Sequence, residues 1–134
     1  MFLRRYKEIM FAVIMIMLLQ TNLKAQYSKI SKTDNLINTI KIKMNGTLQN
    51  RDRKTDKVVY TLDVNNSSYN IIKSKINSIV RQDSDIYYIE SWGYNSSKED
   101  YDIYKATLSL DGIPTRVYVA TNGIIVFYAS INRY

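Results

Sequence analysis

The chain has 134 residues, and its 19 basic and 12 acidic side chains leave a net charge of +7. It contains neither histidine nor cysteine, which removes the commonest general base, the commonest transition-metal ligand and any thiolate or disulfide. Its 4 glycines stand alone, so no glycine-rich phosphate-binding loop is present. We therefore predict a protein that is not an enzyme and that holds no metal or cofactor.

The first 25 residues have the pattern of a secretory signal peptide. Arg4, Arg5 and Lys7 precede an apolar stretch from Ile9 to Leu19, and the segment ends at the small residue Ala25. The apolar stretch is much shorter than the ~20 residues that a membrane-spanning helix needs. We expect cleavage near Ala25 rather than a membrane anchor, which leaves no stable membrane span and places the mature protein in the periplasm or outside the cell.

Residues 26–134 are predicted to form one small domain. Loss of the leader removes four basic and one acidic residue, so the mature chain carries 15 basic and 11 acidic side chains, a mild net charge of +4. Residues 26–35 are polar and lack a sustained apolar period. They are interpreted as a flexible arm or a short helical turn.

Two alternating segments predict a β-hairpin near the start of the mature chain. Ile40, Ile42 and Met44 alternate with polar residues, as in a half-buried strand. Lys57 to Val64 alternates in the same way, with the apolar side chains on one face. We expect these two strands to pair, joined by a long, charged connection over residues 47–56.

A helical period follows the hairpin. Apolar residues recur at three- and four-residue steps, at Tyr69, Ile72, Ile76, Ile79 and Val80. Ser67 or Ser68 is expected to cap the first turn. The helix has weak intrinsic propensity, so it needs a sheet to pack against.

The last third of the chain predicts four consecutive strands. They are Ile86 to Trp92, Tyr101 to Leu110, Ile113 to Ala120, and Ile124 to Ile131. Asp111-Gly112 and Asn122-Gly123 are dipeptides that favour type I′ hairpin turns, whereas residues 93–100 are expected to form a longer polar loop. The last strand is apolar on both faces, which places it in the centre of the sheet or under a covering layer.

Together these elements predict an α+β domain. A hairpin, one helix and a four-stranded meander form an antiparallel sheet of about six strands, with the helix packed on one face. The expected core residues are Ile40, Ile42, Tyr60, Leu62, Leu108, Leu110, Val117, Val119, Ile125 and Phe127.

An aromatic cluster is the first candidate binding site. Six aromatic residues fall on two adjoining predicted strands and the loop between them: Tyr87, Tyr88, Trp92, Tyr94, Tyr101 and Tyr104. Aromatic rings with hydroxyl groups suit glycan or peptide binding because they offer rigid area with a polar edge. Ordinary packing in the core is the alternative, since tyrosine is a preferred strand residue.

A basic patch is the second candidate site. Arg51, Arg53, Lys54 and Lys57 gather in or beside the predicted hairpin connection, diluted by two aspartates. This cluster is narrower than the stripe of a nucleic-acid-binding protein, so no nucleic acid is expected as a partner. Residues 83–85, Asp-Ser-Asp, begin like a calcium loop, but tyrosines stand where the loop needs a ligand and a glycine.

These observations favour an exported, non-catalytic module that binds an unknown protein or glycan through a sheet edge or the aromatic cluster. Two alternatives remain open. One is an inhibitor or immunity-type protein that blocks a secreted enzyme or toxin. The other is an atypical small hydrolase that uses serine, tyrosine, lysine or carboxylate groups. The oligomeric state is not predicted.

Overall fold

The computed structural model describes residues 31–131, so the predicted signal peptide and residues 26–30 lie outside the described residues. Within this range a helix over residues 31–43 precedes the remaining elements. These are, in chain order, β1 (Thr47–Arg53), β2 (Lys57–Asp63), α2 (Tyr69–Gln82), β3 (Ile86–Ser97), β4 (Asp102–Leu110), β5 (Ile113–Ala120) and β6 (Ile124–Ser130).

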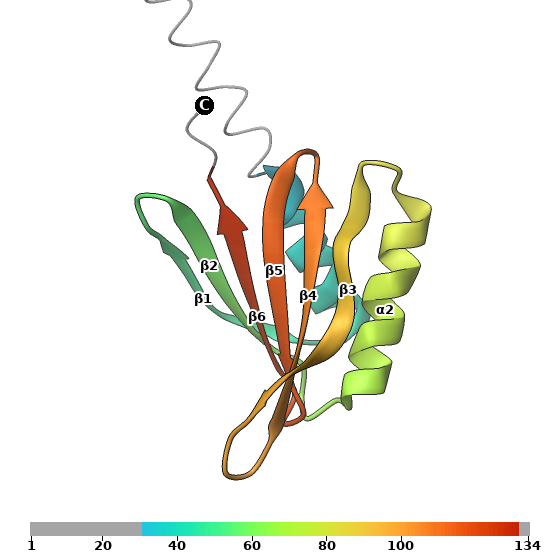
Figure 1. Ribbon diagram of the computed structural model, residues 1–134, viewed down its shortest axis with the longest axis vertical. Helices are drawn as coiled ribbons and strands as arrows, with labels where there is room; N and C mark the ends of the chain where they lie inside the picture. Colours follow the sequence, from blue (N-terminus) through green and yellow to red (C-terminus); the bar gives the residue numbers. More distant parts are fainter. Residues whose placement is uncertain (1–30, 132–134) are drawn as a thin grey trace, which may run out of the picture.

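All six strands form one antiparallel sheet in the order β1-β2-β6-β5-β4-β3 (Figure 1). β3 to β6 make the predicted meander, and β6 returns to pair with β2. The prediction of an α+β domain is therefore confirmed. β6 lies between β2 and β5, as its apolar character on both faces indicated.

Both helices contribute to a single core on one face of the sheet. Ile72, Ile76 and Ile79 of α2 are buried there, as their spacing predicted, and Tyr69 and Val80 pack beside them. The N-cap of α2 is Ser68, whose side-chain oxygen accepts a hydrogen bond from the Ile71 backbone nitrogen at 3.4 Å. The predicted core residues on the strands are all buried.

The prediction of a strand at Ile40, Ile42 and Met44 is wrong. Residues 31–43 are helical, and Ile42 is 70% exposed while Ile40 is fully buried. Side chains two residues apart on a helix point in nearly opposite directions, because each residue rotates the helix by about 100°. The helix docks through Leu36, Ile37 and Ile40. Residues 31–35 form the first turns of this helix. Of the two interpretations given for residues 26–35, a flexible arm or a helical turn, the helical one is correct for residues 31–35.

The true partner of β2 is β1, which lies in the segment predicted to be a connection. Every residue of β1 is exposed, so the strand has no apolar alternation from which it can be recognised. Its charged residues suit the edge of a sheet, where they discourage pairing with other chains. The Lys54 backbone nitrogen donates to the Lys57 carbonyl at 2.8 Å, which closes a short hairpin instead of a long connection.

The two predicted type I′ turns differ. Asp111 and Gly112 both have positive φ, 52° and 86°, so this prediction is confirmed. At the second turn only Gly123 has positive φ, and its nitrogen donates to the Ala120 carbonyl at 3.1 Å. That geometry is a three-residue hairpin loop with a left-handed glycine at its end.

The predicted loop over residues 93–100 is also shorter than expected. β3 continues to Ser97, and the Lys98 nitrogen donates to the Tyr101 carbonyl at 2.8 Å to close the turn. The β3–β4 hairpin is consequently long and extends beyond the rest of the sheet (Figure 1).

Candidate functional site

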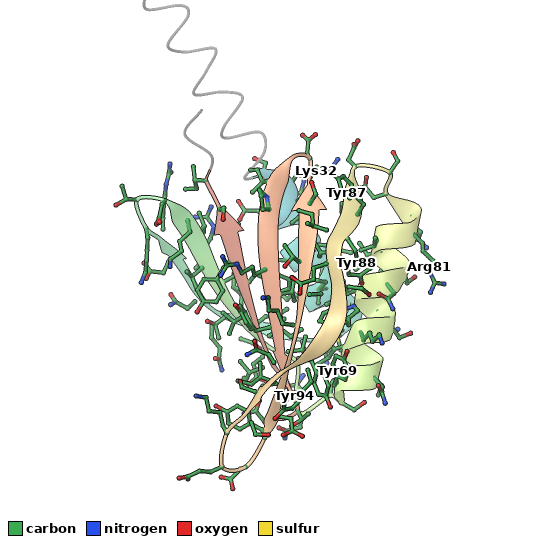
Figure 2. All side chains as sticks on the ribbon, in the orientation of Figure 1. Lys32, Tyr69, Arg81, Tyr87, Tyr88 and Tyr94 are labelled. Carbon is green, nitrogen blue, oxygen red and sulfur yellow. The ribbon has the colours of Figure 1, made fainter. Side chains whose placement is uncertain are left out.

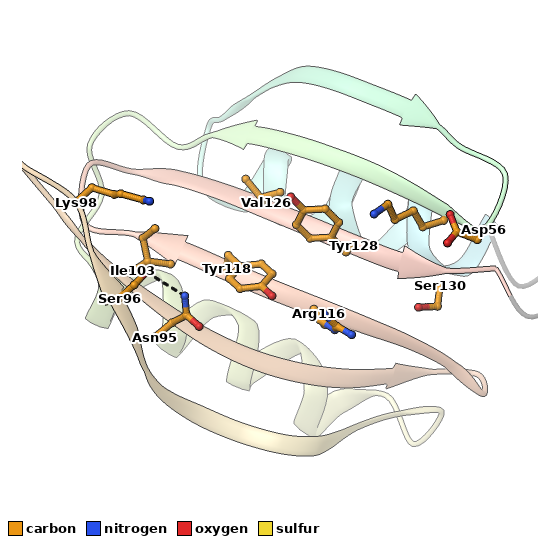
Figure 3. A pocket seen from close by; sticks show the side chains of 11 residues that line it. Asp56, Asn95, Ser96, Lys98, Ile103, Arg116, Tyr118, Val126, Tyr128 and Ser130 are labelled. Carbon is orange, nitrogen blue, oxygen red and sulfur yellow. Dashed lines mark hydrogen bonds between the residues drawn. The ribbon is translucent and has the colours of Figure 1, made fainter.

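The face of the sheet opposite the two helices carries a cavity. It has a volume of about 530 Å³, within the range of small-ligand sites. Figure 3 views this open face with both helices behind the strands. We call this face of the sheet, opposite the two helices, the open face, and its cavity is the candidate site.

The ends of two hairpins bound the cavity. Asn95, Ser96 and Lys98 line it at the end of β3, and Asp56 and Lys57 line it at the β1–β2 turn. Figure 3 places Lys98 and Asp56 at opposite ends of the hollow. The hollow between them follows the direction of the central strands.

Two tyrosine rings form the middle of the cavity. Strand alternation directs Val117, Val119 and Phe127 into the core, and it turns Tyr118 and Tyr128 to the open face. Their ring centroids are 5.5 Å apart with an interplanar angle of 87°. Together the rings make an aromatic corner with one face nearly perpendicular to the other.

The cavity is mainly basic. Lys57, Lys98 and Arg116 line it, against the single carboxylate of Asp56. The Lys57 Nζ atom lies 5.4 Å from the Tyr128 ring centroid, a cation–π contact. Within residues 31–131 none of these three cations forms an ion pair. Their charge is thus available to an anionic ligand.

The predicted aromatic cluster divides between packing and exposure. Tyr88, Trp92 and Tyr104 contact α2: Tyr104 stacks on Tyr69 with centroids 3.8 Å apart, and Trp92 meets the same ring edge-on at 5.8 Å. The Trp92 Nε1 atom donates to the Tyr88 hydroxyl at 2.8 Å, and that hydroxyl donates to Asn77. Burial raises the pKa of Tyr69 and of Tyr88. These rings attach α2 to the sheet.

The other three members do not form a common surface. Tyr87 and Tyr94 are 57% and 60% exposed, and Figure 2 shows them at opposite ends of β3. Tyr101 is partly buried in the β3–β4 turn. The Tyr94 hydroxyl lies 2.6 Å from the Ser97 Oγ atom, which donates to Asp102 at 2.5 Å. This chain of hydroxyl and carboxylate groups lies outside the cavity.

The predicted basic patch is also divided. Arg51 forms two hydrogen bonds with the Asp34 carboxylate, at 3.0 and 3.2 Å, and the same carboxylate accepts from the Tyr60 hydroxyl at 2.6 Å. The hydrogen bond to Asp34 raises the pKa of Arg51. Burial is the largest cause of the raised pKa of Tyr60, and the hydrogen bond from Tyr60 to Asp34 is the second. These contacts fasten the N-terminal helix to β1 and β2. A smaller cavity beside them, about 270 Å³, is lined by the paired Asp34 and Arg51 and also by Lys41.

The remaining patch residues differ in position. Arg53 and Lys54 are exposed at the end of β1 and in its turn, whereas Lys57 faces the cavity. Of the four residues, Lys57 is therefore the one that belongs to the candidate site.

The aspartates of the Asp-Ser-Asp segment have a structural role. The Lys32 Nζ atom lies 2.6 Å from Asp85 and 3.7 Å from Asp83. The hydrogen bond to Asp85 raises the pKa of Lys32. The pairs connect the N-terminal helix to the turn that precedes β3.

The sequence interpretation missed the residues at the centre of the cavity. Arg116, Tyr118, Val126 and Tyr128 share the open face of β5 and β6. The signal was present, because the last strand is apolar on both faces and a second apolar face needs a covering layer or a ligand. This strand was expected to be central or covered on its second face, and that face was not connected with a ligand.

Within residues 31–131, no group of three or more metal-binding side chains is close enough to hold an ion, and no helix is long and apolar enough to cross a membrane. No protein-family model, curated protein or solved structure matches the chain.

Proposed function

We propose that the protein is a small, exported, non-catalytic binding module whose ligand lies on the open face of the sheet. The leader pattern supports export. The observation that carries the proposal is the cavity of about 530 Å³, which is lined by two tyrosine rings and by three cations that form no ion pair within residues 31–131. Concave sites that combine aromatic area with a few polar groups are typical of ligand binding.

The two sheet edges are less suited to binding a partner strand. β1 has 7 residues and ends in three charged ones, Arg51, Asp52 and Arg53. β3 is longer, but its pairing with β4 shifts register at three places. Bulges and edge charges both discourage the addition of another strand. The face is therefore a better candidate than either edge.

The arrangement of polar groups supports a role without catalysis. A serine nucleophile needs an adjacent base and a place for the substrate. Ser97 has a carboxylate neighbour in Asp102, but both lie at the β3–β4 hairpin, outside the cavity lining. The cavity itself offers hydroxyl, amide and cationic groups suited to holding a ligand.

A protein partner is the second candidate, in keeping with an inhibitor or immunity-type role. The observation in its favour is the exposure of Tyr87 and Ile89 on β3, at 57% and 56%. Large exposed apolar side chains on an edge strand suit a protein contact. This surface is separate from the cavity, so variants distinguish the two proposals.

Binding to immobilised polysaccharides tests the proposal. Cellulose, xylan, polygalacturonate and chondroitin sulfate are each incubated with the mature protein, and the bound fraction is measured. We expect retention on at least one of them, and loss of retention in the double variant Tyr118→Ser/Tyr128→Ser. Tyr87→Ser is the matched control, because it removes an exposed tyrosine outside the cavity.

Far-UV circular dichroism and thermal melts establish that each variant is folded. Unchanged retention of the double variant, or loss of retention in Tyr87→Ser or Tyr94→Ser alone, would show that the cavity is not the binding surface. Retention by none of the four materials, together with capture of a stoichiometric protein partner that Tyr87→Ser abolishes, would favour the second candidate.

A further inference from the structure

We propose that the open face binds an acidic saccharide, a sugar chain that carries carboxylate or sulfate groups. This inference rests on the proposed function, since it names the ligand class of the same cavity. Three features of the lining support it: the aromatic corner, the spacing of the cations and the absence of free backbone groups on the central strands.

The aromatic corner suits a sugar ring. A pyranose ring has apolar C–H groups on its faces and hydroxyls around its rim. Tyr118 offers a rigid apolar ring that can pack on the C–H groups of the sugar. The hydroxyl groups of Tyr118 and Tyr128 can bond to the hydroxyls at the rim of the sugar. Ser96, Ser130 and Asn95 add further hydroxyl and amide groups around the same hollow. This mixture matches a ligand rich in hydroxyls.

The cations extend along the cavity instead of meeting at one point. Figure 3 shows Lys98 at one end and Arg116 nearer the opposite end, below Tyr128. Lys57 lies over the Tyr128 ring. Arg116 presents a planar guanidinium, which binds carboxylate or sulfate oxygens in pairs. The spacing fits a chain that carries several acidic groups better than it fits one small anion.

A peptide is a poorer match to this surface. Extended peptides bind sheets mainly through backbone hydrogen bonds at a free edge. The cavity lies over β5 and β6, and both are paired with strands on each side. Ligand recognition here uses side chains alone, which suits a saccharide.

A single-stranded nucleic acid is also a poorer match. Bases bind by stacking on successive exposed aromatic faces. Here the two rings are nearly perpendicular, and Lys57 covers one face of Tyr128. No row of parallel ring faces is offered.

Isothermal titration of the mature protein tests the inference with matched probes. The probes are an oligogalacturonate, its methyl ester, a chondroitin sulfate oligosaccharide, oligoglutamate and oligothymidylate. The ester keeps the sugar chain and removes the charge. The sulfated probe separates recognition of sulfate from recognition of carboxylate alone.

We expect at least one acidic saccharide to bind, with affinity that falls as salt increases. Neutralising one cation, the exposed Arg116 in Arg116→Gln or the half-buried Lys57 in Lys57→Gln, is expected to weaken binding roughly three- to fivefold. Arg116→Glu is expected to weaken it further. Lys75→Glu, which makes the same charge change at an exposed position on α2, is expected to leave binding unchanged.

Equal binding of the oligogalacturonate and its methyl ester, or equal loss in Arg116→Glu and Lys75→Glu, would overturn the inference. If Tyr118→Ser still abolished binding in that case, the open face would remain the binding surface and only the ligand's charge would be wrong. Tighter binding of oligoglutamate or oligothymidylate would replace the saccharide with a peptide or nucleic acid. Binding of none of the acidic saccharides would overturn the ligand class.

Discussion

Truncation of Ile40 and of Ile42 should have very different effects on stability. Ile40 is fully buried and Ile42 is 70% exposed. If these residues formed a strand, both side chains would lie on the same face. Removing a buried isoleucine side chain costs about 2–5 kcal/mol. We expect a loss of about 3 kcal/mol for Ile40→Ala, because Leu36 and Ile37 still hold the helix against the sheet. A surface change at Ile42 should stay within about 0.5 kcal/mol.

Urea denaturation followed by circular dichroism measures both variants. The dependence of the unfolding free energy on urea should be unchanged, so the whole difference should appear in the midpoint. In a domain of this size about 3 kcal/mol corresponds to a decrease in melting temperature on the order of 12 °C. Ile42→Ala should be neutral or slightly stabilising, since alanine is the better helix former. Equal losses in the two variants would refute the helical assignment of residues 31–43.

Three further predictions concern the contacts that hold the fold together. Gly123→Ala should prevent stable folding, because Gly123 has φ +88° and an added Cβ would lie 2.5 Å from the Asn66 nitrogen. The control Gly93→Ala, whose added Cβ would meet nothing within 4 Å, should match the wild type in yield and melting temperature. Equal behaviour of the two variants would contradict the turn geometry. A double-mutant cycle of Asp34→Ala and Tyr60→Phe should give a coupling of about 1–2 kcal/mol in urea denaturation, whereas additive effects would show that their hydrogen bond does not hold the helix. The folded-state pKa of Tyr60 is raised, so the unfolded state loses its proton first and the unfolding free energy should fall as pH rises above about 10. The Tyr60→Phe variant should reduce that slope, and an unchanged slope would contradict the burial of its hydroxyl.

The strands β2 to β6 were predictable because they are rich in β-branched and aromatic residues, and the helix α2 was predictable because its apolar period is long. β5 and β6 are continuous runs of mostly β-branched and aromatic residues, and the spacing of Ile72, Ile76 and Ile79 is unambiguous. The β1 strand was not predictable, since an edge strand that is exposed throughout buries nothing. Only its pairing with β2 reveals it.

The N-terminal helix was missed for another reason. Its first described residues, 31–35, fall in the polar segment interpreted as a flexible arm or a short helical turn, and its buried apolar residues, Leu36, Ile37 and Ile40, begin only after that segment. The short alternation of Ile40, Ile42 and Met44 then imitated a strand. Runs of three apolar residues at a spacing of two do not distinguish the two structures.

The candidate site was predictable in its chemistry but not in its residues. Aromatic and basic side chains do line the cavity, yet Lys57 is the only predicted site residue among them. Most of the predicted aromatic cluster was adjacent in sequence and was therefore grouped together, although β3 carries its members in several directions. The residues of the cavity come from strands that meet only in the folded sheet.

The most direct test of the open face as the binding surface is a nuclear magnetic resonance titration of the mature protein with oligogalacturonate. Our account predicts progressive shifts of the backbone resonances of Arg116, Tyr118 and Tyr128, with α2 and the region of Trp92 unaffected. Shifts concentrated at Trp92 and Tyr94, with none on β5 or β6, would contradict it.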